Sequence, residues 1–201
     1  MPDSSSDPGG PKGSGPLGGG GFAKAAGLSA VACGAFALSL AVAPGLCGVA
    51  LAGLCLAIAV VDTRSMVIPD ELNGLALVLG LAAAGLNATS EPVGAIADAA
   101  ARAATMFALF YLFRALYRRV RGVAGMGLGD VKLAAAAGAW LDWPYLPVVV
   151  DIAALSALAV ALLAILRGRE VTLSARIPFG AFFAPSIWAC WLFASWRSAP
   201  L

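Results

Sequence analysis

Two aspartates are notable because each lies at one end of an apolar run. Asp62 closes one run and opens the stretch 62–70, which reads Asp-Thr-Arg-Ser-Met-Val-Ile-Pro-Asp. Asp130 follows Gly-Leu-Gly at 127–129 and precedes Val-Lys. A carboxylate at the edge of a bilayer costs free energy wherever it is desolvated, which suggests a function. Two close carboxylates cannot both ionise easily, so one can act as base on water while the other protonates a carbonyl. Together they would make an aspartyl protease.

The composition indicates an integral membrane protein. Of 201 residues, 61% are hydrophobic and only 12% are charged, and the mean hydropathy is +0.90. The net charge of +2 is too small to indicate nucleic acid binding. Histidine is absent, which excludes Ser-His-Asp catalysis, Cys-His catalysis and histidine metal sites. The four cysteines lie singly in apolar stretches, so we expect neither a metal nor a cofactor.

Apolar runs of about bilayer length predict an all-α bundle of about seven transmembrane helices. The predicted helices cover residues 23–43, 46–62, 71–88, 94–118, 129–141, 145–166 and 179–196. The fifth is short for a full span, so we expect it to lie tilted or enclosed, and its alanine-rich face suits close helix packing.

The same pattern divides the chain into three parts. Residues 1–21 are mostly Gly, Pro and Ser, and we expect them to be disordered. Residues 22–45 are predicted to form an N-terminal transmembrane helix, and residues 46–197 a core of six helices. A signal peptide cleaved after Ala41-Val42-Ala43 is the alternative for the first helix, but Pro44 and the neutral lead-in favour a retained helix.

The basic residues predict the orientation of the bundle. Three of the six connections contain arginine: those after the second, fourth and sixth helices. The other three contain neither Lys nor Arg. By the positive-inside rule, the arginine-bearing connections and the N-terminus face the cytoplasm. Asp62 and Asp130 would then share the cytoplasmic interface, which gives them the common depth that a catalytic pair needs.

Simpler interpretations of the charged residues stay open. Asp130 could be only a helix N-cap, and Asp62 could be only an interfacial charge paired with Arg64. Pro69 is predicted to set the start of the third helix after an extended Ile68, with Asp70 and Glu71 complementing the N-terminus of that helix.

Three further charges are given partners. We expect Lys132 to bind a lipid phosphate or a substrate carboxylate, and Asp98 to pair with Arg102 four residues later. For Asp151 we expect a structural hydrogen bond inside the bundle.

Three segments resemble the prepilin peptidases, membrane aspartyl proteases of the Gly-x-Gly-Asp type. Residues 62–70 look like the first motif of that family, residues 127–132 like its second, and residues 177–184 (Ile-Pro-Phe-Gly-Ala-Phe-Phe-Ala) like its third. The order and spacing of the motifs agree over roughly residues 47–191.

The resemblance implies cleavage of a leader peptide from type IV pilin-like precursors at the cytoplasmic face of a bacterial inner membrane, with tight-adherence pilins as one possible substrate group. Asp62 and Asp130 would be the catalytic pair, and which of them is the base stays open. The supporting or substrate-positioning residues would be Gly127, Gly129, Lys132, Arg64, Ile68 and Pro69. The expected partners are the precursor and the lipid bilayer; no oligomeric state is predicted.

Full-length members of the family also carry an N-terminal domain with paired Cys-x-x-Cys motifs and methylate the new N-terminus using S-adenosylmethionine. Neither cysteine motif occurs in this chain. We therefore expect a short, protease-only form without N-methyltransferase activity.

Two other classes of function compete with a protease. A small transporter could use Asp62 and Asp130 as ligands for a proton or cation. A membrane scaffold would need neither carboxylate. If the protein is a scaffold, the variants Asp62→Asn and Asp130→Asn should both keep their function.

Overall fold

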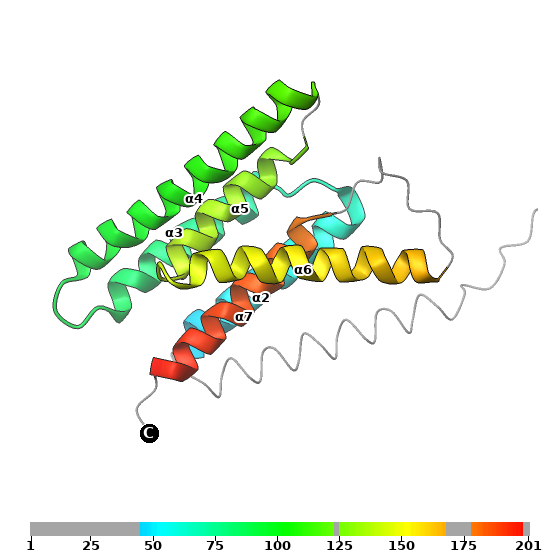
Figure 1. The fold of residues 1–201 in the computed structure, drawn as a ribbon. Coiled ribbons are helices and arrows are strands. Elements are labelled where there is room, and N and C mark those ends of the chain that lie inside the picture. The colour runs from blue at the N-terminus through cyan, green and yellow to red at the C-terminus, as the bar shows by residue number, and fades with distance from the viewer. Residues whose placement is uncertain (1–44, 123–124, 168–177, 199–201) are drawn as a thin grey trace, which may run out of the picture.

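The computed structural model describes residues 45–122, 125–167 and 178–198. Within these ranges the chain forms six α-helices and no strand (Figure 1). They are α2 (Gly45–Ser65), α3 (Asp70–Asn87), α4 (Pro92–Arg121), α5 (Leu128–Trp140), α6 (Tyr145–Leu166) and α7 (Gly180–Ser198). The prediction of an all-helical protein is confirmed. The predicted helix at 23–43 and the tail at 1–21 lie outside the described residues.

The two largest differences from the predicted helix ends have local causes. Helix α2 continues three residues past Asp62, and it ends where Met66 adopts a left-handed backbone with φ 55°. Helix α4 continues three residues past Arg118, because arginine favours the helix and complements the C-terminal dipole. It ends at Gly122, where φ is 73° and the backbone N–H donates to the Arg118 carbonyl.

Helix α5 lies between α3 and α4, and these three helices form one side of the molecule (Figure 1). Every residue from Leu133 to Trp140 is buried, so the short helix is enclosed as its length suggested. At Gly138 a Cβ atom would lie 2.6 Å from the Arg102 carbonyl oxygen, so only glycine lets α4 approach this closely. At the far end of α5, Trp140 Nε1 donates to the Ala76 carbonyl at 2.8 Å.

The other side of the molecule is built on α7. Helix α7 packs along α2 and also contacts α6 (Figure 1). Pro185 lies inside α7 and has no N–H, so the Ala181 carbonyl receives no helical hydrogen bond from that position.

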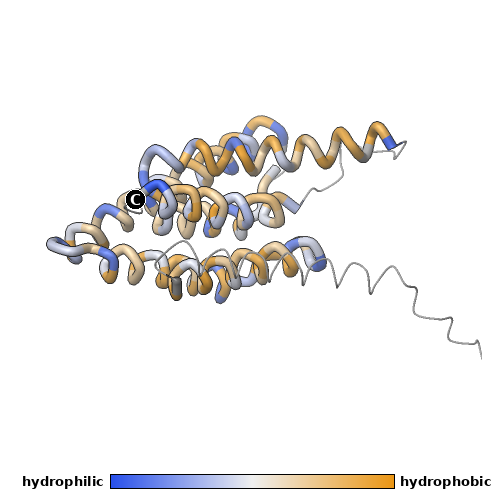
Figure 2. Tube along the Cα trace, turned by 90° about the horizontal axis from the view of Figure 1, so that it is seen from below, coloured by the Kyte–Doolittle hydropathy of each residue, from blue (hydrophilic) through white to orange (hydrophobic). Residues whose placement is uncertain are grey.

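Three of the described helices are long and apolar enough to cross a membrane: α2 from Leu46 to Ser65, α4 over its whole length, and α6 from Tyr145 to Leu163. Figure 2 shows apolar residues along most of each helix and hydrophilic residues mainly near helix ends and connections. The total of seven crossings stays a prediction.

One predicted ion pair is confirmed and one predicted hydrogen bond is wrong. Arg102 pairs with Asp98, as their spacing suggested. Asp151 is exposed on α6, and within the described part of the chain no hydrogen bond holds it inside the bundle. The buried face of α6 carries Val149 and Ala153, and Asp151 lies two residues from each, which points it away from that face.

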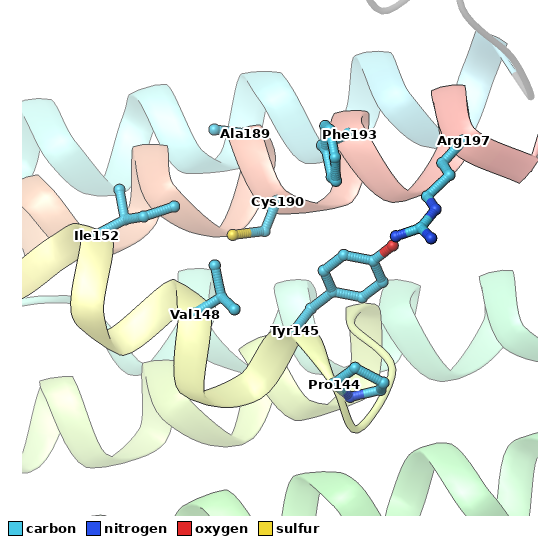
Figure 3. Close-up of a pocket in the computed structure, with 8 residues that line it drawn as sticks. All are labelled: Pro144, Tyr145, Val148, Ile152, Ala189, Cys190, Phe193 and Arg197. Atoms are coloured by element: carbon cyan, nitrogen blue, oxygen red, sulfur yellow. The ribbon is translucent and has the colours of Figure 1, made fainter.

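An apolar groove of about 590 Å³ separates the start of α6 from the end of α7 (Figure 3). Its lining includes Val148, Ile152 and Cys190, and at one end Tyr145 and Arg197 point toward each other. Among the residues that the structure describes, no carboxylate lines the groove. It is therefore separate from the two aspartates considered next.

Candidate active site

Asp62 lies in the last turn of α2 and is buried, with 5% of its surface exposed. Its Oδ2 accepts a hydrogen bond of 2.9 Å from the backbone N–H of Ala181. Ala181 is the second residue of α7, and its N–H also donates to the Pro178 carbonyl at 3.3 Å, so the two acceptors share it. The N-terminus of α7 thus stabilises a buried carboxylate.

Asp130 lies in the first turn of α5, outside the three candidate spans, and is half-buried. The pKa of the Asp130 carboxyl is raised from 3.8 to about 6. Burial is the largest cause, and the charge of nearby Asp62 is the second. Backbone N–H groups of Gly127 and Gly180 act in the opposite direction by hydrogen bonding the carboxylate. The Gly180 N–H also faces Asp62. The Gly180 amide therefore lies close to both carboxylates.

Ile68 brings the three sequence motifs into one place. It is buried, and it packs against Gly129 of the second motif and Gly180 of the third. A Cβ atom on Gly129 would lie 3.1 Å from Ile68 Cβ. One on Gly180 would lie 2.6 Å from Ile68 Cδ1 and 2.9 Å from the Asp62 carboxylate oxygen. An alanine at position 180 would therefore displace the Ile68 side chain or the Asp62 carboxylate.

Two polar contacts tie the start of α3 to the start of α5. Asn73 Nδ2 donates to the Gly129 carbonyl at 3.1 Å, and Lys132 Nζ lies 2.6 Å from Asp70 Oδ2. The partner predicted for Lys132 was a lipid phosphate or a substrate carboxylate, whereas the structure pairs it with Asp70. Both side chains are substantially exposed, so this pair contributes little to stability.

A third tether comes from α4. Arg114 Nε donates to the Met126 carbonyl at 3.0 Å, within the glycine-containing loop that leads to Asp130. In the same loop a Cβ on Gly125 would lie 2.5 Å from the Tyr117 ring. Arg114, Asn73 and Tyr117 were not predicted as site residues from the sequence. A polar Asn in the apolar run of α3 was the available signal.

The simpler interpretations of the two aspartates fare differently. Helix α5 starts at Leu128 with Gly127 as its N-cap, so Asp130 is the third residue of the helix, and its carboxylate still caps the helix by accepting from the Gly127 N–H. Arg64 is exposed and forms no ion pair with Asp62, whose oxygen accepts from Ala181 instead.

The remaining predicted site residues lie around the pair. Pro69 immediately precedes α3, and Asp70 and Glu71 occupy its first turn as expected. A Cβ on Gly127 would lie 3.3 Å from the Asp130 carboxylate oxygen, so this glycine adjoins the site directly.

The chain is similar in sequence to known proteins. Residues 49–163, more than half of the chain, match the sequence profile of the Type IV leader peptidase family. A protein of Burkholderia pseudomallei (strain K96243), named prepilin leader peptidase/N-methyltransferase, is 39% identical over 160 residues, which cover 77% of this chain and 48% of that protein.

Two proteins with the same name are similarly related. That of Aeromonas hydrophila is 33% identical over 156 residues, covering 76% of this chain and 52% of the relative. That of Pseudomonas aeruginosa is 34% identical over 135 residues, covering 66% and 44%. The chain thus spans about half the length of these relatives, and no solved structure matches it. On its sequence match over more than half its length, the chain belongs to the type IV leader peptidase family.

Proposed function

We propose that this protein is an aspartic endopeptidase that removes the leader peptide from type IV pilin-like precursors, with Asp62 and Asp130 as the catalytic pair. The observation that carries the proposal is the meeting of these two carboxylates at the Gly180 amide. Membership of a leader peptidase family supports the reaction and the substrate class.

The chemistry follows from a shared proton. Because the pKa of Asp130 is raised to about 6 beside a second carboxylate, the pair holds one proton at mildly acidic pH and titrates as a unit. The ionised carboxylate takes a proton from water as the water oxygen bonds to the scissile carbonyl carbon. The protonated carboxyl donates to the carbonyl oxygen. The peptide C–N bond then breaks as the carboxyl that took the water proton gives it to the leaving nitrogen. The other carboxylate regains a proton from a hydroxyl group of the tetrahedral intermediate.

Exposed apolar side chains lie next to Asp62 and Asp130 in the sequence and could bind an apolar segment of a precursor. Met66 and Val67 follow Asp62 and are 50% and 67% exposed, and Leu128 precedes Asp130 and is 48% exposed. Exposed apolar groups gathered near a polar site are typical of a surface that binds another protein or a membrane. We assign them to the part of the precursor next to the cleaved bond.

We place the site at the cytoplasmic face of a bacterial inner membrane. Helix α4 ends with Arg118, Arg119 and Arg121 just before the loop that leads to Asp130. Such a cluster next to a membrane helix favours the cytoplasmic side.

The test uses the purified full-length chain in detergent and a leader-bearing pilin precursor, with cleavage followed by gel shift and mass spectrometry. The wild type should release the leader, and Asp62→Asn and Asp130→Asn should not. Normal cleavage by either variant would contradict the assignment. Tight-adherence and type IVa precursors, offered side by side, identify the preferred substrate group.

A further inference from the structure

Asn73 is a buried polar residue that the proposed reaction does not use. It is the fourth residue of α3 and is 2% exposed. Its Nδ2 donates to the Gly129 carbonyl at 3.1 Å, while its Oδ1 is buried and has no hydrogen-bond partner among the described residues. A buried amide with half its polar atoms unpaired costs free energy that an apolar side chain of similar size would avoid. Packing alone therefore does not explain an asparagine here.

The contact fixes which way the amide faces. A carbonyl oxygen only accepts, so the Asn73 side chain must present its NH₂ group to Gly129. The unpaired Oδ1 is the consequence of that orientation. Asn73 thus makes the hydrogen bond from Nδ2 to the Gly129 carbonyl while its Oδ1 stays without a partner among the described residues.

The Gly129 carbonyl belongs to the planar peptide unit that also contains the Asp130 nitrogen. Holding that carbonyl sets the plane of the unit, and with it the direction in which Asp130 leaves the backbone. Gly129 is the second residue of α5, so the helix already directs this peptide unit, and Ile68 packs against the Cα side of Gly129. Asn73 adds a hydrogen bond to the carbonyl from the neighbouring helix.

We propose that Asn73 is a positioning residue that orients Asp130 toward Asp62 through the Gly129–Asp130 peptide. The proposal rests on the proposed function, because it assigns Asn73 a part in cleavage. It predicts that losing the amide donor misaligns the pair without changing how the precursor binds.

The first variant is Asn73→Leu, which keeps the volume and removes the donor. We expect kcat to fall about ten- to hundredfold, the effect of a small misplacement of a catalytic group. We expect KM to stay within about twofold, since ground-state binding is untouched. Both are measured with the full-length chain in detergent and a leader-bearing precursor.

The second variant, Asn73→Asp, tests the donor itself. In its protonated form the new carboxyl can donate to the Gly129 carbonyl, whereas in its ionised form it cannot. Burial favours the protonated form, so the rate relative to wild type should be near normal at low pH and fall as pH rises through the pKa of the new carboxyl. Helices α2, α4 and α5 contact α3. The charged residues of these four helices are Asp62, Arg64, Asp70, Glu71, Asp98, Arg102, Arg114, Arg118, Arg119, Arg121, Asp130 and Lys132. All of them are also present in the wild type, so rates are compared with wild type at each pH.

The matched control is Trp140→Phe. It removes another side-chain hydrogen bond between α3 and α5, the 2.8 Å bond from Trp140 Nε1 to the Ala76 carbonyl, far from Asp130. We expect it to lower the melting temperature and to leave kcat unchanged. An equal loss of kcat in Trp140→Phe and Asn73→Leu would overturn the proposal, because the loss would then follow interface stability.

The outcomes separate this inference from the proposed function. If the wild type does not cleave the precursor, the proposed function fails. If the wild type cleaves, Asp130→Asn does not, and Asn73→Leu keeps the wild-type kcat, only the role of Asn73 is overturned. Should Asn73→Leu fail to fold, Asn73→Asp decides: a relative rate that does not change with pH overturns the proposal, and a relative rate that falls with rising pH supports it.

Discussion

Asp62 and Asp130 carry the same chemical group but are held in different ways. Asp62 is held through its own carboxylate, whose Oδ2 accepts from the Ala181 N–H. The Asp130 carboxylate also accepts from backbone N–H groups, but the turn that carries it is held in addition through its backbone: Asn73 donates to the Gly129 carbonyl and Arg114 donates to the Met126 carbonyl.

The difference follows from the helices that carry them. Helix α2 has 21 residues and packs along α7, so its last turn is already fixed and Asp62 needs only a local partner. Helix α5 has 13 residues and begins just after a loop, so its first turn depends on side chains from α3 and α4. Sensitivity to substitution should therefore be concentrated around Asp62 and spread over several helices around Asp130.

The largest expected effect treats both carboxylates alike. Asp62→Asn and Asp130→Asn should each lower kcat by roughly 10³-fold, since each removes a general acid or base. The control is Asp151→Asn, which changes an exposed carboxylate on α6 and should keep normal cleavage. If one of these two variants were active and the other inactive, the two aspartates would not form a catalytic pair.

The next effect is a pH dependence that sharpens the difference between the two sites. The pKa of Asp130 is raised to about 6, so its proton is present below that pH and lost above it. A pair that needs one shared proton should lose kcat/KM by about tenfold per pH unit above 6. The Asp62→Asn variant lacks the negative charge that raises the pKa of Asp130. An NMR titration of ¹³C-labelled aspartate should therefore show a lower pKa for Asp130 in this variant than in the wild type. An unchanged pKa would mean that the two side chains do not interact.

A smaller effect is expected on the Asp62 side. Gly180→Ala would place a methyl group 2.9 Å from the Asp62 carboxylate oxygen and 2.6 Å from Ile68 Cδ1. We expect kcat to fall about tenfold as the carboxylate is displaced. Gly74→Ala is the control, because a Cβ there meets nothing within 4 Å. Equal activity of the two alanine variants would show that α7 does not fix Asp62.

The smallest effect concerns the side chains of α3 and α4 that hold the turn carrying Asp130. Arg114→Leu removes one of the two hydrogen bonds to this turn, and since Asn73 still holds Gly129, we expect kcat to fall only about threefold. Arg118→Leu, an exposed arginine on the same helix, is the matched control and should cleave normally. The double variant Arg114→Leu with Asn73→Leu should lose more than the product of the single effects if the two tethers substitute for each other.

Much of the fold could be predicted from the sequence. Hydrophobic runs and their Pro, Gly and charged boundaries place all six described helices within three residues of their observed ends. They do so because a membrane-class helix is defined by a long apolar run that is hard to miss. The approach of Asp62 to Asp130 was also predicted, from matching depth and from the resemblance of the flanking motifs.

The contacts between helices were beyond such an analysis. The bond from Asn73 to Gly129 depends on the register of α3 against α5, and one sequence does not reveal which turn of one helix faces which turn of another. The same limit explains why Lys132 was assigned an external partner when Asp70 lies beside it. Position 180 belonged to a recognised motif, but its steric role became visible only when Ile68 and Asp62 were found around it.

Pro185 gives α7 a particular mechanical property. The Ala181 N–H binds Asp62, and the carbonyl of the same residue lacks the helical bond that Pro185 cannot donate. Bending α7 at this turn therefore breaks one hydrogen bond fewer than bending an uninterrupted helix. The first turn of α7 should therefore bend more easily than the rest of the helix, which packs along α2. Such bending would move the hydrogen-bond donor of Asp62 relative to Asp130.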